Sequence, residues 1–161
     1  MKTYYAKIAV PIGELLIVSD GTHIIRINMD HQKYAADVQN NWEMNPELPI
    51  IARAIAQLQS YFAGDLKAFD LPLHTEGTAF QQSVWRALAM IPFGHTVSYG
   101  ELARRIGNPG ASRAVGLANG KNPIAIVLPC HRVVGANGSL TGYGGGLHRK
   151  QWLLDMERRF R

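Results

Sequence analysis

Residues 98–120, SYGELARRIGNPGASRAVGLANG, contain the segment that decides the fold. Ser98 is a suitable helix N-cap, and Glu101 stands where it can complete a capping box, so a helix is predicted to begin here. The Gly and Pro residues of 107–110 predict a tight turn, and a second helix is expected over 111–119. Two helices at this spacing are typical of a helix-turn-helix.

The second helix of this motif has mostly small side chains, among them Ser112 and Ala114, and Arg113 is its only long one. Helix-turn-helix regulators usually read bases with long polar side chains from this helix. A surface of small residues can lie close against a DNA groove but specifies little sequence. We therefore expect recognition by shape and backbone, with Arg113 free to fill the space of a base that has left the stack. The alternative is a packed core helix with one surface arginine.

The first half of the chain predicts a small N-terminal α/β domain over residues 1–76. Apolar residues alternate or cluster in 4–10, 15–18 and 24–27, with turn residues between them, which indicates a β-meander. Apolar positions then recur at helical spacing over 48–62 and end before an Ala-Gly pair, which predicts one helix.

The second half, residues 77–161, predicts a mostly helical C-terminal domain, so the fold class is α/β followed by α. Thr78 is expected to cap a helix, and a last helix is expected from Leu147 to about residue 159. Between the helix-turn-helix and that last helix, the apolar run before Cys130 predicts a strand, followed by a hairpin through 135–138.

Charge is distributed unevenly between the two halves. Residues 1–79 have 6 Lys and Arg against 9 Asp and Glu, a balance of −3, whereas residues 80–161 have 11 against 3, a balance of +8. A strongly basic half suggests a polyanion-binding domain; the alternative is a basic surface that only confers solubility. No secretory signal and no apolar run of about 20 residues is apparent, so a soluble, cytoplasmic protein is expected.

Cys130 is the only cysteine, and it stands in the run IVLPCHRVV. A single cysteine excludes an intramolecular disulfide and any multi-cysteine zinc or iron–sulfur site. The adjacent His131 and Arg132 would lower the pKa of the thiol toward neutrality, which predicts a reactive nucleophile. The alternative is a buried structural cysteine that behaves as a small apolar residue.

The sequence resembles a known family over residues 78–158. The resemblance rests on the runs ANGKNP (118–123), PCHRV (129–133), GGL (145–147) and WLLDME (152–157). These runs resemble the O6-alkylguanine-DNA alkyltransferases, also called methylated-DNA–protein-cysteine methyltransferases, in their bacterial Ogt type. The first half resembles the family mainly in layout.

The resemblance implies roles for a set of catalytic residues. Cys130 would be the nucleophile, His131 its base acting through a water, and Glu157 the carboxylate that orients the imidazole. Asn122 would support this relay by hydrogen bonding, and Tyr99 would donate to the leaving oxygen and crowd the adjacent phosphate. From spacing alone, Asn122 could be a turn residue, Glu157 part of a solvated helix face and Tyr99 a packing residue.

The resemblance also implies a set of DNA and substrate contacts. They are Ser112, Arg113, Ala114, Val133, Tyr143, Gly144 and Gly145. Arg113 would fill the space of the flipped nucleotide, and the backbone of Val133 would recognise the guanine edge. Tyr143 and the glycines after it would form a flexible wall of the pocket, although such a glycine run can equally be only a permissive loop.

The implied activity is DNA repair by irreversible transfer of the alkyl group from O6-alkylguanine, and from O4-alkylthymine, to Cys130. Each molecule would act once, as a monomer on double-stranded DNA, without cofactor or metal and without a membrane. The structural zinc of some family members cannot be built with one cysteine. Two other interpretations stay open: a helix-turn-helix module that binds DNA without chemistry, and a Cys–His acyl hydrolase.

Overall fold

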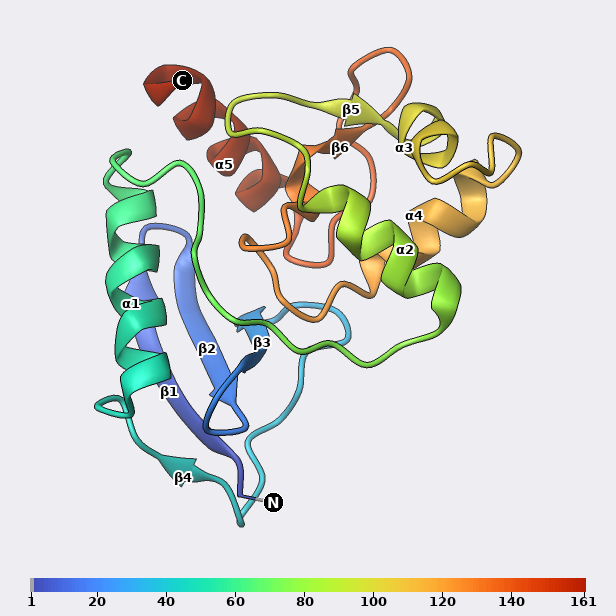
Figure 1. Ribbon diagram of the computed structural model, residues 1–161. Coiled ribbons are helices and arrows are strands. Elements are labelled where there is room, and N and C mark those ends of the chain that lie inside the picture. The colour runs from blue at the N-terminus through green and yellow to red at the C-terminus, as the bar shows by residue number, and fades with distance from the viewer. Residues whose placement is uncertain (1) are drawn as a thin grey trace. The chain divides into compact units, whose positions relative to one another are not determined.

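The computed structural model describes residues 2–161 (Figure 1). The chain divides into two compact units. Unit 1 consists of Met1–Thr75 and Pro123–Ala125, and unit 2 consists of Glu76–Asn122 and Ile126–Arg161. The expected order of an α/β unit followed by a mostly helical unit is confirmed.

Unit 1 contains a four-stranded sheet in the order β3-β2-β1-β4. The strands are β1 (Tyr4–Val10), β2 (Gly13–Ser19), β3 (Ile24–Met29) and β4 (Glu43–Met44). The first three pair antiparallel, which confirms the meander. The short β4 pairs parallel to β1 at one edge, a strand that the polar sequence around it does not predict.

Helix α1 (Pro49–Phe62) packs against β1 and β2 (Figure 1). Its proline stands in the first turn, where a missing backbone N–H costs no hydrogen bond. Its apolar face, predicted by the helical spacing, is buried at Ile51, Ala54 and Leu58. These side chains form the core of unit 1 together with the buried face of the sheet.

A short segment from later in the chain completes the sheet side of unit 1. The backbone N–H of Ile27 donates to the Pro123 carbonyl at 3.0 Å, and the N–H of Ala125 donates to the Ile27 carbonyl at 3.0 Å. Ile124 is fully buried. The chain thus pairs with β3 immediately before it re-enters unit 2.

Unit 2 contains four α-helices among the described residues. They are α2 (Ala79–Leu88), α3 (Tyr99–Arg105), α4 (Ser112–Gly120) and α5 (Leu147–Phe160). Thr78 caps α2 as expected, and Gln81 completes a capping box with it. The helix-turn-helix is formed by α3 and α4, which pack against each other and against α2. The Trp85 indole fixes this packing by donating to the Ala118 carbonyl at 2.9 Å.

The expected capping box of α3 is only half formed. Ser98 Oγ accepts from the Glu101 N–H at 3.0 Å, but the Glu101 carboxylate lies against Arg104 and Arg105 instead. Two arginines one turn further along the helix offer the carboxylate stronger, charge-assisted partners than a backbone N–H.

The strand expected at Cys130 is wrong. Of the hairpin expected after it, the turn forms, with hydrogen bonds from the Gly138 N–H to the Gly135 carbonyl and from the Gly135 N–H to the Ser139 carbonyl, but no returning strand follows among the described residues. Cys130–Arg132 form a single 3-10 turn, η1, and only Val133–Val134 form a strand, β6. Pro129 precedes the turn and cannot donate to a ladder. The β6 strand pairs in parallel with β5 (Val97–Ser98), so no returning hairpin strand pairs with it.

Candidate active site

The nucleophile candidate Cys130 begins the 3-10 turn η1 and is 7% exposed. The three residues of such a turn point in different directions, which separates the Cys130, His131 and Arg132 side chains around one short segment. The parallel β5–β6 pair joins Val133 to Val97, and so connects the end of this segment to the start of α3.

His131 and Glu157, 26 positions apart in the chain, meet in the interior of unit 2. Nε2 of His131 lies 2.6 Å from Oε2 of Glu157, and both side chains are fully buried. Glu157 lies on α5, so the alternative of a solvated helix face is excluded. Because an ionised carboxylate only accepts, the imidazole proton lies on Nε2 and the lone pair on Nδ1. Within residues 2–161 nothing hydrogen-bonds to this buried Nδ1.

The pKa of Cys130 does not follow the prediction that its neighbours would lower it toward neutrality. Burial raises the pKa of the Cys130 thiol, an effect that a hydrogen bond from Asn122 and the positive charge of Lys150 offset only in part. Burial also lowers the pKa of His131, against the opposing effect of Glu157. The neighbouring imidazole is therefore neutral at rest, and the thiol stays protonated instead of being acidified.

Two asparagines hold the turn that carries Cys130. Asn122 is buried and its Nδ2 donates to the Leu128 carbonyl at 2.7 Å. Asn119, at the end of α4, donates to the Cys130 carbonyl at 3.3 Å. Asn119 is absent from the sequence-based site; the signal for it is a polar residue on the otherwise apolar buried side of α4.

The site predicted from the sequence also lacks Lys150, whose side chain is fully buried. Its Nζ donates to the Val133 carbonyl at 2.6 Å and to the Thr141 carbonyl at 2.9 Å. Burial lowers the pKa of Lys150 to about 8. The Tyr99 hydroxyl donates to the same Thr141 carbonyl at 3.3 Å. Tyr99 and Lys150 therefore hold one loop residue from two helices, α3 and α5.

The loop after Thr141 brings Tyr143 beside Cys130. Burial, followed by the neighbouring Cys130, raises the pKa of the Tyr143 phenol well above its ordinary value. Gly144 is half-buried and Gly145 is buried in the same loop. Gly146 has a φ of 94° where α5 begins, a left-handed conformation that favours glycine.

One side of helix α4 is exposed to solvent. Ser112, Arg113 and Ala114 are all exposed, whereas Val115 on the opposite side is buried. The alternative of a fully packed core helix is thereby excluded. The structure brings Cys130, His131, Glu157, Asn122, Val133, Tyr99 and Tyr143 into one connected set, and leaves the α4 surface residues outside it.

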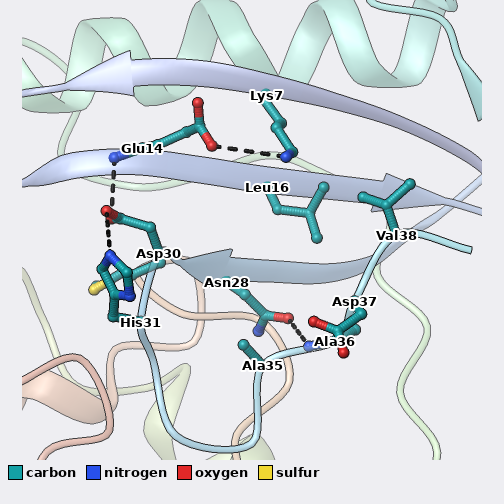
Figure 2. Close-up of a pocket in the computed structure, with 11 residues that line it drawn as sticks. Lys7, Glu14, Leu16, Asn28, Asp30, His31, Ala35, Ala36, Asp37 and Val38 are labelled. Carbon is teal, nitrogen blue, oxygen red and sulfur yellow. Dashed lines mark hydrogen bonds and ion pairs between the residues drawn. The ribbon is translucent and has the colours of Figure 1, made fainter.

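Unit 1 has a pocket of about 200 Å³ that none of the candidate residues lines (Figure 2). Its polar groups already pair with one another: the Glu14 N–H donates to Asp30 at 3.2 Å, and the Ala36 N–H donates to Asn28 Oδ1 at 3.0 Å. Lys7 lies 3.8 Å from the Glu14 carboxylate.

Among residues 2–161, no cluster of three or more His, Cys, Asp or Glu side chains is placed to hold a metal ion. In the same part of the chain, no helix is both long and apolar enough to span a bilayer.

Two family descriptions match most of the chain. The family "6-O-methylguanine DNA methyltransferase, DNA binding domain" matches residues 79–159, and "6-O-methylguanine DNA methyltransferase, ribonuclease-like domain" matches residues 3–75.

Individual relatives match along almost the full chain. A methylated-DNA–protein-cysteine methyltransferase from Methanosarcina acetivorans is 53% identical over 96% of this chain and 97% of its own length. One from Mycolicibacterium paratuberculosis is 54% identical over 96% of this chain and 92% of its own. The crystal structure of Mycobacterium tuberculosis OGT in complex with DNA superposes with a TM-score of 0.91 at 50% identity, covering 98% of this chain and 94% of that one.

Proposed function

Because this chain belongs to the 6-O-methylguanine DNA methyltransferase family, we propose that it repairs O6-alkylguanine in double-stranded DNA by moving the alkyl group onto Cys130. We extend the proposal to O4-alkylthymine, whose alkyl group is also carried on an exocyclic oxygen. The observation that carries the proposal is the only thiol of the chain placed next to a buried His131–Glu157 pair.

Activation of the thiol is the first step of the proposed reaction. Cys130 is protonated at rest, so a base must take its proton before it can attack. The free lone pair of His131 Nδ1 supports its role as that base, with one water carrying the proton between the two groups. Glu157 accepts from Nε2 and stabilises the imidazolium that forms.

In the transfer itself, the Cys130 thiolate attacks the alkyl carbon bonded to O6 of guanine. A new carbon–sulfur bond forms, the carbon–O6 bond breaks, and its electron pair goes to O6. The nucleobase then takes up one proton, which balances the proton lost by the thiol, and becomes unmodified guanine. We assign to the Tyr99 hydroxyl the hydrogen bond to O6 as its charge develops.

The product is a thioether, which has no easy leaving group. Each molecule therefore reacts once and needs no cofactor. Asn122 and Asn119 hold the backbone of the reacting segment. We assign to Tyr143, beside Cys130, and to the glycines after it one wall of the site that receives the alkylated base. The Val133 backbone reads the edge of the base.

DNA binding is assigned to the exposed side of α4. The +8 balance of residues 80–161 favours attraction to phosphates, and Ser112 and Ala114 allow the helix to come close to the groove. Arg113 fills the space left by the extruded nucleotide. A reduced thiol as the reacting group favours a reducing compartment, so we assign the protein to the cytoplasm, acting as a monomer.

The test is the intact mass of the protein after incubation with an excess of duplex containing O6-methylguanine. We expect one methyl group per chain, located on Cys130, and no further product. The Cys130→Ser variant should remain unmodified but still bind the duplex. An unmodified wild-type chain that binds DNA would favour a binding module, and turnover on esters would favour an acyl hydrolase.

A further inference from the structure

Glu157 accepts hydrogen bonds from two basic side chains at once. The Arg132 guanidinium contacts both carboxylate oxygens, with Nε 2.8 Å from Oε1 and Nη2 3.0 Å from Oε2. His131 shares Oε2 at 2.6 Å. Arg132 is only 6% exposed, so this two-bond pair is shielded from solvent.

The guanidinium is itself fixed from another side. Its third nitrogen, Nη1, donates to the Ile91 carbonyl at 2.6 Å. The Gly94 N–H also donates to Glu157 Oε1, at 3.2 Å. The loop between α2 and β5 therefore holds both members of the pair. Arg132 cannot turn away from Glu157 without removing the donor of the buried Ile91 carbonyl and two of the donors of the buried carboxylate.

This arrangement decides how the negative charge of Glu157 is balanced. The charged groups that act on His131 are Glu157 and Lys150 from α5 and Arg132 from η1. The titratable Tyr143, from the loop before α5, interacts with Glu157 and with Cys130. Arg132 already neutralises Glu157, so an imidazolium would add an unbalanced charge in the interior, next to a second buried cation at Lys150. A plain His–Glu pair would favour the imidazolium instead.

We propose that Arg132 is a positioning residue that keeps His131 neutral, with its proton on Nε2, by supplying the counter-charge of Glu157. Nothing in the sequence-based site assigns this role to Arg132. The inference rests on the proposed function, because it concerns the availability of the base in that reaction. It also gives a cause for the protonated resting thiol: with no imidazolium beside it, the positive charge of Lys150 offsets the effect of burial only in part, and Cys130 does not become a thiolate before substrate binds.

The first test uses the wild-type protein and nitrogen NMR of isotope-labelled histidine, across the range of about pH 5 to about pH 8 in which free histidine titrates. We expect the His131 signal to show the neutral ring with the proton on Nε2 over this whole range. A His131 that titrates at its ordinary pKa or above it would overturn the proposal.

The second test compares variants in their alkylation by free O6-benzylguanine, which needs no DNA binding. Arg132→Met removes the counter-charge that Arg132 gives Glu157, so the low-pH limb of the rate profile should move to higher pH by about one unit or more. Arg132→Lys keeps the charge and should keep the limb near its wild-type position. The double variant Arg132→Met/Glu157→Gln removes both charges, so its limb should return toward low pH while its rate falls at every pH.

A role of Arg132 in folding alone would reduce the reactive fraction at all pH values and leave the limb where it is, and that result would contradict the proposal. If Arg132→Met does not fold, the wild-type NMR and Arg132→Lys still decide the question. Failure of the proposed function would look different: the wild-type chain would then gain no methyl group from the O6-methylguanine duplex.

Discussion

Lys150 allows a quantitative prediction, because its charge is buried without a carboxylate partner among residues 2–161. Its pKa lies at about 8 in the folded protein, against an ordinary 10.5. The difference corresponds to about 3 kcal/mol by which the ammonium form is disfavoured in the fold. The unfolded chain binds more protons between these two pKa values, so the contribution of Lys150 to stability should rise with pH through that window.

The perturbation is Lys150→Met, which removes the charge and keeps an unbranched side chain. At neutral pH the relief of the buried charge and the loss of the donor to the Val133 carbonyl, worth about 1–3 kcal/mol, oppose each other, so the net change should be small. The informative quantity is the wild-type stability minus that of the variant. It should grow by about 2 kcal/mol between about pH 7 and about pH 9.5.

The assay is urea unfolding of both proteins at a series of pH values. Both chains should carry Cys130→Ser, because Cys130 interacts with Lys150 and because a thiol in the unfolded chain ionises at about pH 8.5. Taking the difference cancels the other titrating groups that the two proteins share. A difference that stays flat with pH would show that Lys150 titrates alike in the folded and unfolded chain, and the reasoning from its burial would be refuted.

Three further predictions concern activity and DNA binding. Arg113→Ala should slow repair of O6-methylguanine in duplex DNA, because base extrusion costs more without Arg113, by about a few kcal/mol at most. The rate with free O6-benzylguanine should be unchanged. Equal losses on both substrates would contradict the assignment that Arg113 fills the space of the extruded nucleotide. Glu157→Gln should slow both substrates on the order of 10²-fold or more and shift the pH profile of alkylation, because it disturbs the base; a loss confined to duplex DNA would contradict this. Binding to undamaged duplex, measured by fluorescence anisotropy, should weaken steeply with salt and depend little on sequence, whereas a strong preference for one sequence would favour a regulator.

The helices and the meander could be predicted because their signals are local. Thr78 with Gln81 marks the start of α2, and apolar spacing marks α1. The segment around Cys130 could not be predicted in this way. Its apolar run resembles a strand, but Ile126 and Val127 lie in a turn and Cys130–Arg132 form a 3-10 turn. The β5–β6 pair forms between residues 36 positions apart.

Likewise, only some of the site residues could be predicted from the sequence. Cys130, His131, Asn122 and Glu157 could be named from the sequence through the family resemblance. Lys150 could not, because nothing in the sequence of α5 distinguishes this buried lysine from exposed cations of the same helix such as Arg158 and Arg159. The expected acidity of Cys130 was wrong for a related reason: sequence adjacency to a cation does not show that the cation is already paired elsewhere, as Arg132 is with Glu157.

The pairing of Pro123–Ala125 with β3 has a consequence for dissecting this chain. The segment that belongs to the sheet of unit 1 lies between Asn122 and the reacting Cys130. A fragment that begins at residue 76 would contain every candidate catalytic residue, yet it would leave Ile124 without its apolar surroundings and the backbone around it without Ile27. Genetic or proteolytic separation of the two units thus removes a support from the loop that leads to the nucleophile. A boundary for such a fragment cannot follow the chain order alone, because residues 123–125 belong to the sheet of unit 1 although they lie between two segments of unit 2.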